Sequence, residues 1–183
     1  MSKTRALRLL DHAMSGPAVD VCSHLVEAAG LKTVFGMFMK KQDNATTEHL
    51  LGVFSALLRL LPGESAARIR TLAKFVEKDY EKVSKLMKLR RDYASRRAEK
   101  SDEWFSRRLD AGLYCLQTLD VILAWLVAED DGARKRVVQL LGERDETLAA
   151  LRSSLEEQLD GVGDLNEDKD TAEMLNALLD FLK

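Results

Sequence analysis

The stretch from Glu64 to Asp131 constrains the fold more than any other part of the chain. It contains no proline and a single glycine, Gly112. Because proline and glycine are the residues that most disfavour a helix interior, this composition permits long helices throughout the stretch. Asp79 and Ser101 are predicted to be N-caps. The stretch should therefore fold as three helices, at about 65–77, 80–99 and 102–128.

The helix predicted at 102–128 has the strongest burial pattern. Its leucines recur at steps of three and four residues, which places them on one face of an α-helix. Leu113 and Leu116 are central on that face, so we expect both to be buried. After Asp120 the helix is apolar on every side, from Val121 to Ala128. Such a helix must be covered on all sides, and the other elements are therefore expected to pack around it.

The remaining segments also favour helices, which predicts an all-α fold. Gly30 is expected to be the C-cap of the second helix, and Thr46 or Thr47 the N-cap of the fourth. Residues 31–39 are short and apolar and fit either a strand or a buried helix, and the neighbouring helices favour the helix. The helices outside the first stretch are expected at about 3–14, 17–29, 31–39, 48–61, 133–141, 146–159 and 171–182.

Composition narrows the class of protein. The chain has 183 residues, is 46% apolar and 32% charged, and has two prolines and 6% aromatic residues, which argues against an all-β fold. The length is typical of one domain, so residues 1–183 are predicted to form a single helical domain. The longest apolar run, eight residues, is too short to cross a membrane. Cys22 and Cys115 lie in helical patterns and are expected to be buried, reduced thiols.

Charge is distributed unevenly along the chain. Residues 68–100 hold twelve basic and five acidic residues, whereas residues 143–183 hold four basic and twelve acidic residues. The basic helix is a candidate surface for an acidic partner segment or for RNA. Alternatively, the two segments are solvated faces, or the basic helix docks on the acidic segment. The residues proposed for partner binding are Lys85, Lys88, Arg90, Arg91, Arg96 and Arg97.

The polar face of the helix at 102–128 supports two interpretations. Arg107 can pair with Glu103 or Asp110, and Asp110 shares a face with Gln117. These side chains either pair with a neighbouring helix and fix its register, or recognise a partner. The candidate structural or recognition residues are Arg107, Arg108, Asp110 and Gln117.

No motif in the sequence indicates catalysis, a metal or a cofactor. The three histidines lie on three different predicted helices, and Cys22 and His24 point to opposite sides of one helix. The sequence contains no glycine-rich phosphate loop, no GxSxG and no HExxH. We therefore expect a protein that is not an enzyme and needs no cofactor.

Four blocks of sequence together resemble one family. They are LDHAMSGP at 10–17, TTEHLLGVFSALLRLL at 46–61, EKVSKLMKL at 81–89 and FSRRLDAGLYCLQ at 105–117. In this order they are similar to the C-terminal region of the β-catenin-like protein 1 family, over roughly residues 1–130, with the similarity fading beyond about Arg144. The resemblance implies an armadillo/HEAT-like helical repeat, or α-solenoid, and a C-terminal fragment of a longer protein.

The same resemblance implies a function. Members of this family are nuclear, non-catalytic scaffolds that associate with the spliceosome and bind basic, nuclear-localisation-type segments of splicing partners. This chain departs from the family in two ways: a long acidic insert before the FSRRLDAG helix is reduced to a few residues around Ser101, and the earlier repeats that form the peptide groove are missing. The expected function is a nuclear splicing scaffold with no membrane association, and the alternative is an RNA-binding module that uses the helix at 80–99.

Overall fold

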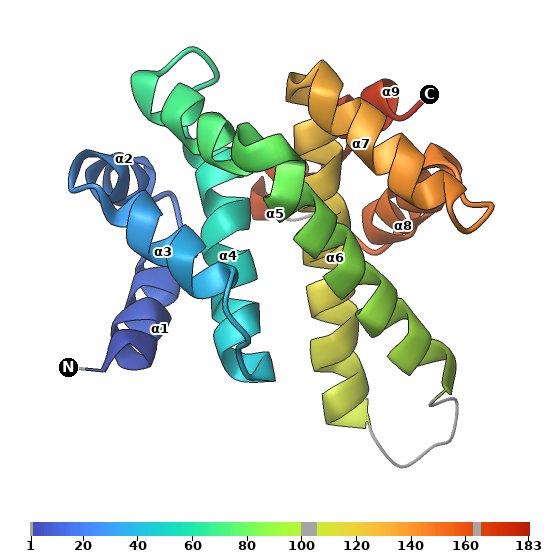
Figure 1. The fold of residues 1–183 in the computed structure, drawn as a ribbon, viewed down its shortest axis with the longest axis horizontal. Helices are drawn as coiled ribbons and strands as arrows, with labels where there is room; N and C mark the ends of the chain where they lie inside the picture. Colours follow the sequence, from blue (N-terminus) through green and yellow to red (C-terminus); the bar gives the residue numbers. More distant parts are fainter. Residues whose placement is uncertain (1, 100–105, 163–165) are drawn as a thin grey trace. The chain divides into compact units, whose positions relative to one another are not determined.

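The structure, a computed structural model, describes residues 2–99, 106–162 and 166–183, and all regular secondary structure in these ranges is α-helical. The all-α prediction is confirmed. Side chains are described except at 97–99, 106–111 and 166–168. The helices, labelled in Figure 1, are α1 (Lys3–Ala13), α2 (Val19–Glu27), α3 (Gly30–Phe38), α4 (Asn44–Leu60), α5 (Ala66–Glu99), α6 (Ser106–Glu129), α7 (Asp131–Gly142), α8 (Leu148–Asp160) and α9 (Asn166–Phe181).

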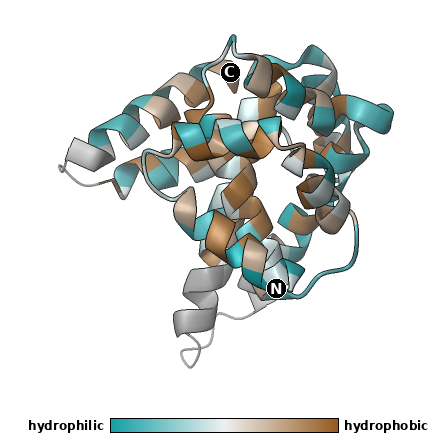
Figure 2. Ribbon diagram, turned by 90° about the vertical axis from the view of Figure 1, so that its left-hand side faces the viewer, coloured by the Kyte–Doolittle hydropathy of each residue, from teal (hydrophilic) through white to brown (hydrophobic). Residues whose placement is uncertain are grey.

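The chain forms two compact units, Met1–Lys82 and Val83–Lys183. Most helices in each unit are amphipathic, and Figure 2 shows apolar and polar residues on the same helices. Such a helix directs one face into a core and leaves the other in water. Whether the two units act as one domain, as expected for residues 1–183, stays a prediction.

In the first unit, helix α4 contacts α1, α2 and α3 and supplies more buried residues than any of these three helices. Four phenylalanines from three helices pack together in this core. The centre of the Phe54 ring lies 4.6 Å from that of Phe35, 5.1 Å from that of Phe38 and 5.2 Å from that of Phe75. Phe35 and Phe75 meet edge to face. Large buried rings in tilted and edge-to-face pairs are a strong source of core stability, so this cluster anchors the unit.

Two caps in the first unit differ from the sequence prediction. The N-cap of α4 is Asp43, whose carboxylate accepts the Thr46 backbone N–H at 2.7 Å, whereas Thr46 and Thr47 are buried inside the helix. Hydrogen bonds from Thr46 hold the pKa of Asp43 below its usual value. Gly30 is not a C-cap either: Ala29 takes the left-handed conformation, and Gly30 opens α3. A side chain at Gly30 would collide with Leu25, which explains the glycine at the start of α3.

Helix α5 is interrupted close to the boundary predicted between 77 and 80. Glu77 has an extended ψ of 155°, and Lys78, Asp79 and Tyr80 all have left-handed backbone angles. Asp79 is therefore not an N-cap, because an N-cap residue normally has β-region angles and Asp79 has a φ of 54°. The other predicted cap, Ser101, lies outside the described residues.

In the second unit, α6 contacts α7, α8 and α9. Burial on every side was predicted for Val121–Ala128. Leu119–Ala124, Leu126 and Val127 are buried, but Trp125 and Ala128 are only half-buried, so the prediction is wrong for these two residues. Leu116 is buried as expected, but Leu113 is only half-buried, so the prediction is wrong for Leu113. The buried part of α6 therefore begins at Cys115 and Leu116, about one helical turn after Leu113, where the leucine spacing had placed it.

By length and composition alone, the window Gly112–Glu129 of α6 could also cross a membrane. In the fold, however, 61% of that window is buried against the protein. The core helix of a soluble protein meets the same criteria, so this helix is weak evidence for membrane association. The C-terminal helices follow the predicted order, but α9 starts at Asn166 instead of Thr171.

Candidate interaction surface

The basic residues of α5 that follow its interruption do not form one exposed patch. Lys88 and Arg96 are exposed, and Lys85 and Arg91 are half-buried. Arg90 is buried, with 10% of its side chain accessible, so the expectation of exposure is wrong for Arg90. The side chain of Arg97 lies outside the described residues.

Arg90 is held in a buried ion pair that joins three parts of the second unit. Its Nε donates to Asp120 Oδ1 on α6 at 2.6 Å, and its Nη1 donates to Glu146 Oε2 in the α7–α8 connection at 3.3 Å. Only 1% of the Asp120 side chain is exposed. Burial raises the pKa of Asp120, and the charge of Arg90 together with a Ser154 hydrogen bond opposes that rise. Arg90 therefore joins α5 to α6 and to the α7–α8 connection within the second unit.

Arg91 also contacts other residues of the second unit. Its Nη2 donates to the Leu140 carbonyl near the end of α7 and lies 3.4 Å from Glu143 Oε2. An arginine at a helix C-terminus satisfies carbonyls that have no partner within the helix and interacts favourably with the helix dipole. Arg90 and Arg91 thus contact Glu146 and Glu143, the first glutamates of the acidic segment 143–183. One alternative to a partner surface was that the basic helix docks on the acidic segment. Arg90 and Arg91 make such contacts.

Among the other candidate residues with described side chains, Lys88 and Arg96 are exposed and Lys85 is half-buried, and we call these three residues the basic face. Burial first, and the neighbouring Lys88 second, lower the pKa of Lys85. The Arg96 guanidinium lies 5.5 Å from the centre of the Tyr93 ring, a cation–π contact that keeps it close to the helix. Asp92 is exposed one turn from both Lys88 and Arg96. The basic face is consequently smaller and more mixed in charge than the sequence predicted.

Of the four candidate residues on the central helix, only one has a described side chain. Gln117 is half-buried, and its backbone carbonyl accepts a hydrogen bond from Gln158 of α8 at 3.5 Å. This contact joins two neighbouring helices. The side chains of Arg107, Arg108 and Asp110 lie outside the described residues, so their roles stay predictions.

A contact between two of the family-like blocks was not anticipated from the sequence. Asp11 in the first block and His49 in the second are 2.8 Å apart, between carboxylate Oδ2 and ring Nδ1. The contact brings α1 close to α4 at Gly52, where a Cβ atom would lie 2.1 Å from Asp11 Oδ1. A side chain at position 52 would displace the Asp11 carboxylate, so Gly52 leaves room for this carboxylate beside α4. The sequence held one indication of this contact: Asp11, His49 and Gly52 all lie in the two blocks that resemble the family.

The described residues give no geometry for metal or thiol chemistry. No group of three His, Cys, Asp or Glu residues converges among them. Both cysteines are buried, as expected. Burial raises the pKa of Cys22 to about 11, which disfavours the nucleophilic thiolate.

Comparison with known proteins gives consistent matches over most of the chain. Residues 1–156 match a family model described as "Catenin-beta-like, Arm-motif containing nuclear". The beta-catenin-like protein 1 homolog of Schizosaccharomyces pombe is 32% identical over 170 residues, which cover 84% of this chain and 30% of that protein. Beta-catenin-like protein 1 of Mus musculus is 35% identical over 197 residues, covering 90% of this chain and 35% of that protein.

Beta-catenin-like protein 1 of Homo sapiens gives the same picture, with 34% identity, 90% of this chain and 35% of that protein covered. The chain thus spans about a third of the length of the curated relatives it matches. The match to the family model also reaches residue 156, further than the limit near Arg144 expected from the four blocks.

Proposed function

The chain belongs to the catenin-beta-like, Arm-motif containing family of nuclear proteins, and we propose that it is a non-catalytic protein-interaction scaffold that works in the nucleus with the spliceosome. The observation that carries the proposal is the family match over residues 1–156. The all-helical, armadillo-like fold supports it, because stacked helices provide extended surfaces for binding other proteins.

The partners of this scaffold are splicing proteins, which include proteins with basic, nuclear-localisation-type segments. The acidic excess of residues 143–183 supports this partner class, because opposite charges favour association. Glu143 and Glu146 already contact arginines of α5. Exposed acidic groups on α8 and α9, such as Glu157 and Glu173, are the ones open to a partner.

Affinity capture from nuclear extract tests the proposal. The full chain is immobilised at physiological salt, and the captured proteins are identified by mass spectrometry. Recovery of splicing factors over a matched unrelated helical protein supports the scaffold function. If splicing factors are not enriched over that protein, the proposal is wrong.

The basic face gives a second test with a matched control. Lys88→Glu combined with Arg96→Glu reverses two exposed charges, and Arg8→Glu combined with Lys41→Glu makes the same charge change on exposed residues of the first unit. If the basic face binds a partner, the first pair weakens capture and the control pair does not. The loss should shrink at high salt, because exposed charges are screened over about 8–10 Å.

Direct RNA binding by the helix at 80–99 is the second candidate function. Exposed Lys88 and Arg96 favour it, whereas the internal contacts of Arg90 and Arg91 reduce the charge available. The two exposed cations, Lys88 and Arg96, would give a slope of log affinity against log salt of about −1.4 for single-stranded RNA. A fluorescence-anisotropy titration that detects no RNA binding at low salt excludes this function.

A further inference from the structure

The interruption of α5 has an unusual backbone. Lys78, Asp79 and Tyr80 have φ values of 56°, 54° and 58°, and all three carry side chains. L-amino acids with a Cβ disfavour this conformation, which occurs mostly as single residues and is typical of glycine. Three such residues in a row require compensating contacts from the side chains around them.

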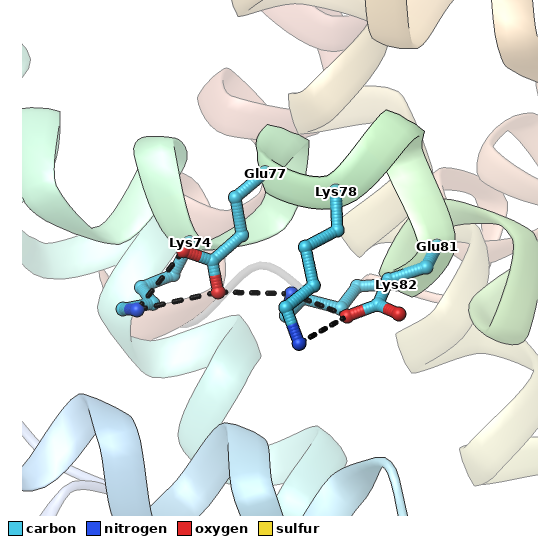
Figure 3. Close-up of polar contacts among 5 residues, drawn as sticks. All are labelled: Lys74, Glu77, Lys78, Glu81 and Lys82. Atoms are coloured by element: carbon cyan, nitrogen blue, oxygen red, sulfur yellow. Dashed lines mark hydrogen bonds and ion pairs between the residues drawn. The ribbon is translucent and has the colours of Figure 1, made fainter.

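An ion cluster surrounds this turn, formed by Lys74, Glu77, Lys78, Glu81 and Lys82 (Figure 3). Lys82 is its central residue, because Lys82 Nζ lies 3.0 Å from Glu77 Oε1 and 3.1 Å from Glu81 Oε1. Only 3% of the Lys82 side chain is exposed. Hydrogen bonds from Lys74 and Lys82 lower the pKa of Glu77, so this carboxylate stays charged.

The contact between Glu77 and Lys82 depends on the turn. In a continuous α-helix, residues three or four apart are neighbours, whereas residues five apart point about 140° away from each other. Glu77 and Lys82 are five apart and could not pair there. Lys82 would instead lie one turn from Lys78, a like charge. The pairs Lys74–Glu77 and Lys78–Glu81 are three apart and fit either conformation.

We propose that α5 contains a two-state joint, in which the Glu77–Lys82 ion pair holds the left-handed turn against a continuous helix. The competing helix is accessible because residues 66–99 contain neither proline nor glycine. The joint ends at Lys82, the last residue of the first compact unit. Any partner that draws Glu77 or Lys82 out of the pair releases the turn.

The experiment measures the backbone angle of the three residues directly in the full, isotope-labelled chain. The three-bond coupling between the amide and α protons is larger at a left-handed φ of about +57° than at a helical φ of about −63°. The unmodified chain should show the larger coupling at Lys78, Asp79 and Tyr80. Glu77→Gln removes the pair that depends on the turn, and it should shift these couplings toward the helical value.

Lys74→Gln is the matched control. It removes a cluster pair of the same type that a continuous helix also permits, so it should leave the couplings unchanged. Lys82→Gln should act like Glu77→Gln. Because Lys82 is buried, Glu77→Gln at a half-exposed position decides the test if Lys82→Gln does not fold.

A rescue variant completes the design. Asp79→Gly lowers the cost of a left-handed residue, so Glu77→Gln combined with Asp79→Gly should return the other two couplings to the larger value. The proposal is overturned if Glu77→Gln leaves the couplings unchanged, or if Lys74→Gln shifts them by the same amount.

Discussion

Replacing Arg90 with methionine tests whether the basic helix is held from within the second unit. Methionine keeps much of the length of the arginine side chain and removes its charge. In the variant, the Asp120 carboxylate loses the donor at 2.6 Å while it stays buried, with 1% of its side chain exposed. An uncompensated charge in such a site is strongly unfavourable.

The size of the effect follows from this burial. Removing one partner of a buried ion pair typically costs about 3–5 kcal/mol of unfolding free energy. The contact with Glu146 adds little, because 41% of the Glu146 side chain is exposed. For a chain of this length, a loss of that size lowers the melting temperature by about 6–20 °C.

The loss should depend on pH. Burial raises the pKa of Asp120, and Arg90 opposes the rise, so removing Arg90 raises the folded-state pKa further above the unfolded value. A carboxyl with a raised folded pKa binds a proton more readily in the folded state than in the unfolded state. Stability of the variant relative to the unmodified chain should therefore increase as pH falls below 7 through that raised pKa.

Thermal unfolding followed by circular dichroism, at pH 7 and at several lower values, measures both effects. Lys88→Met is the control, since it removes an exposed charge two residues away and should change the melting temperature little. Replacing Asp120 with leucine in the Arg90→Met background should recover most of the loss, because no charge is then left buried. A drop below about 2 °C for Arg90→Met, or an equal drop for Lys88→Met, would refute the reasoning.

Three further predictions concern packing. Gly52→Ala should cost about 1–3 kcal/mol, since the new methyl group displaces the Asp11 carboxylate, and chemical denaturation should find it much less costly in an Asp11→Ala background. Leu119→Ala should cost about 2–5 kcal/mol and the half-buried Leu113→Ala clearly less, so equal melting losses would contradict the burial assigned to α6. Cys22 should resist alkylation at pH 7 until the chain unfolds, and modification by iodoacetamide at the rate of a free thiol in the folded protein would contradict its burial and its raised pKa.

The sequence predicted what depends on local patterns. The helical class follows from composition and period, and the burial of most α6 residues after Asp120 follows from the loss of polar residues there. The break in α5 was placed within a few residues. Its left-handed backbone was not predicted, because it depends on Lys82 contacting Glu77 across the turn.

The sequence could not predict the fate of the basic residues. Lys88 and Arg90 have the same charge and are two positions apart, yet one is exposed and the other buried. The difference comes from Asp120 and Glu146, which are 30 and 56 residues from Arg90 along the chain. Asp11 and His49, 38 residues apart, are a second case. Pairing over such separations is set by the tertiary fold and leaves no periodic signal.

The burial of α6 has a consequence for synthesis in the cell. The three helices that cover it all follow it in the chain, and the last of them ends at Phe181. At a translation rate of about 5–20 residues per second, the ribosome needs about 3–10 s to add them after Glu129. During that interval α6 lacks these three helices, and the one helix of its own unit already made is the part of α5 that carries Arg90. We therefore expect general chaperones to bind α6 in the nascent chain during this interval.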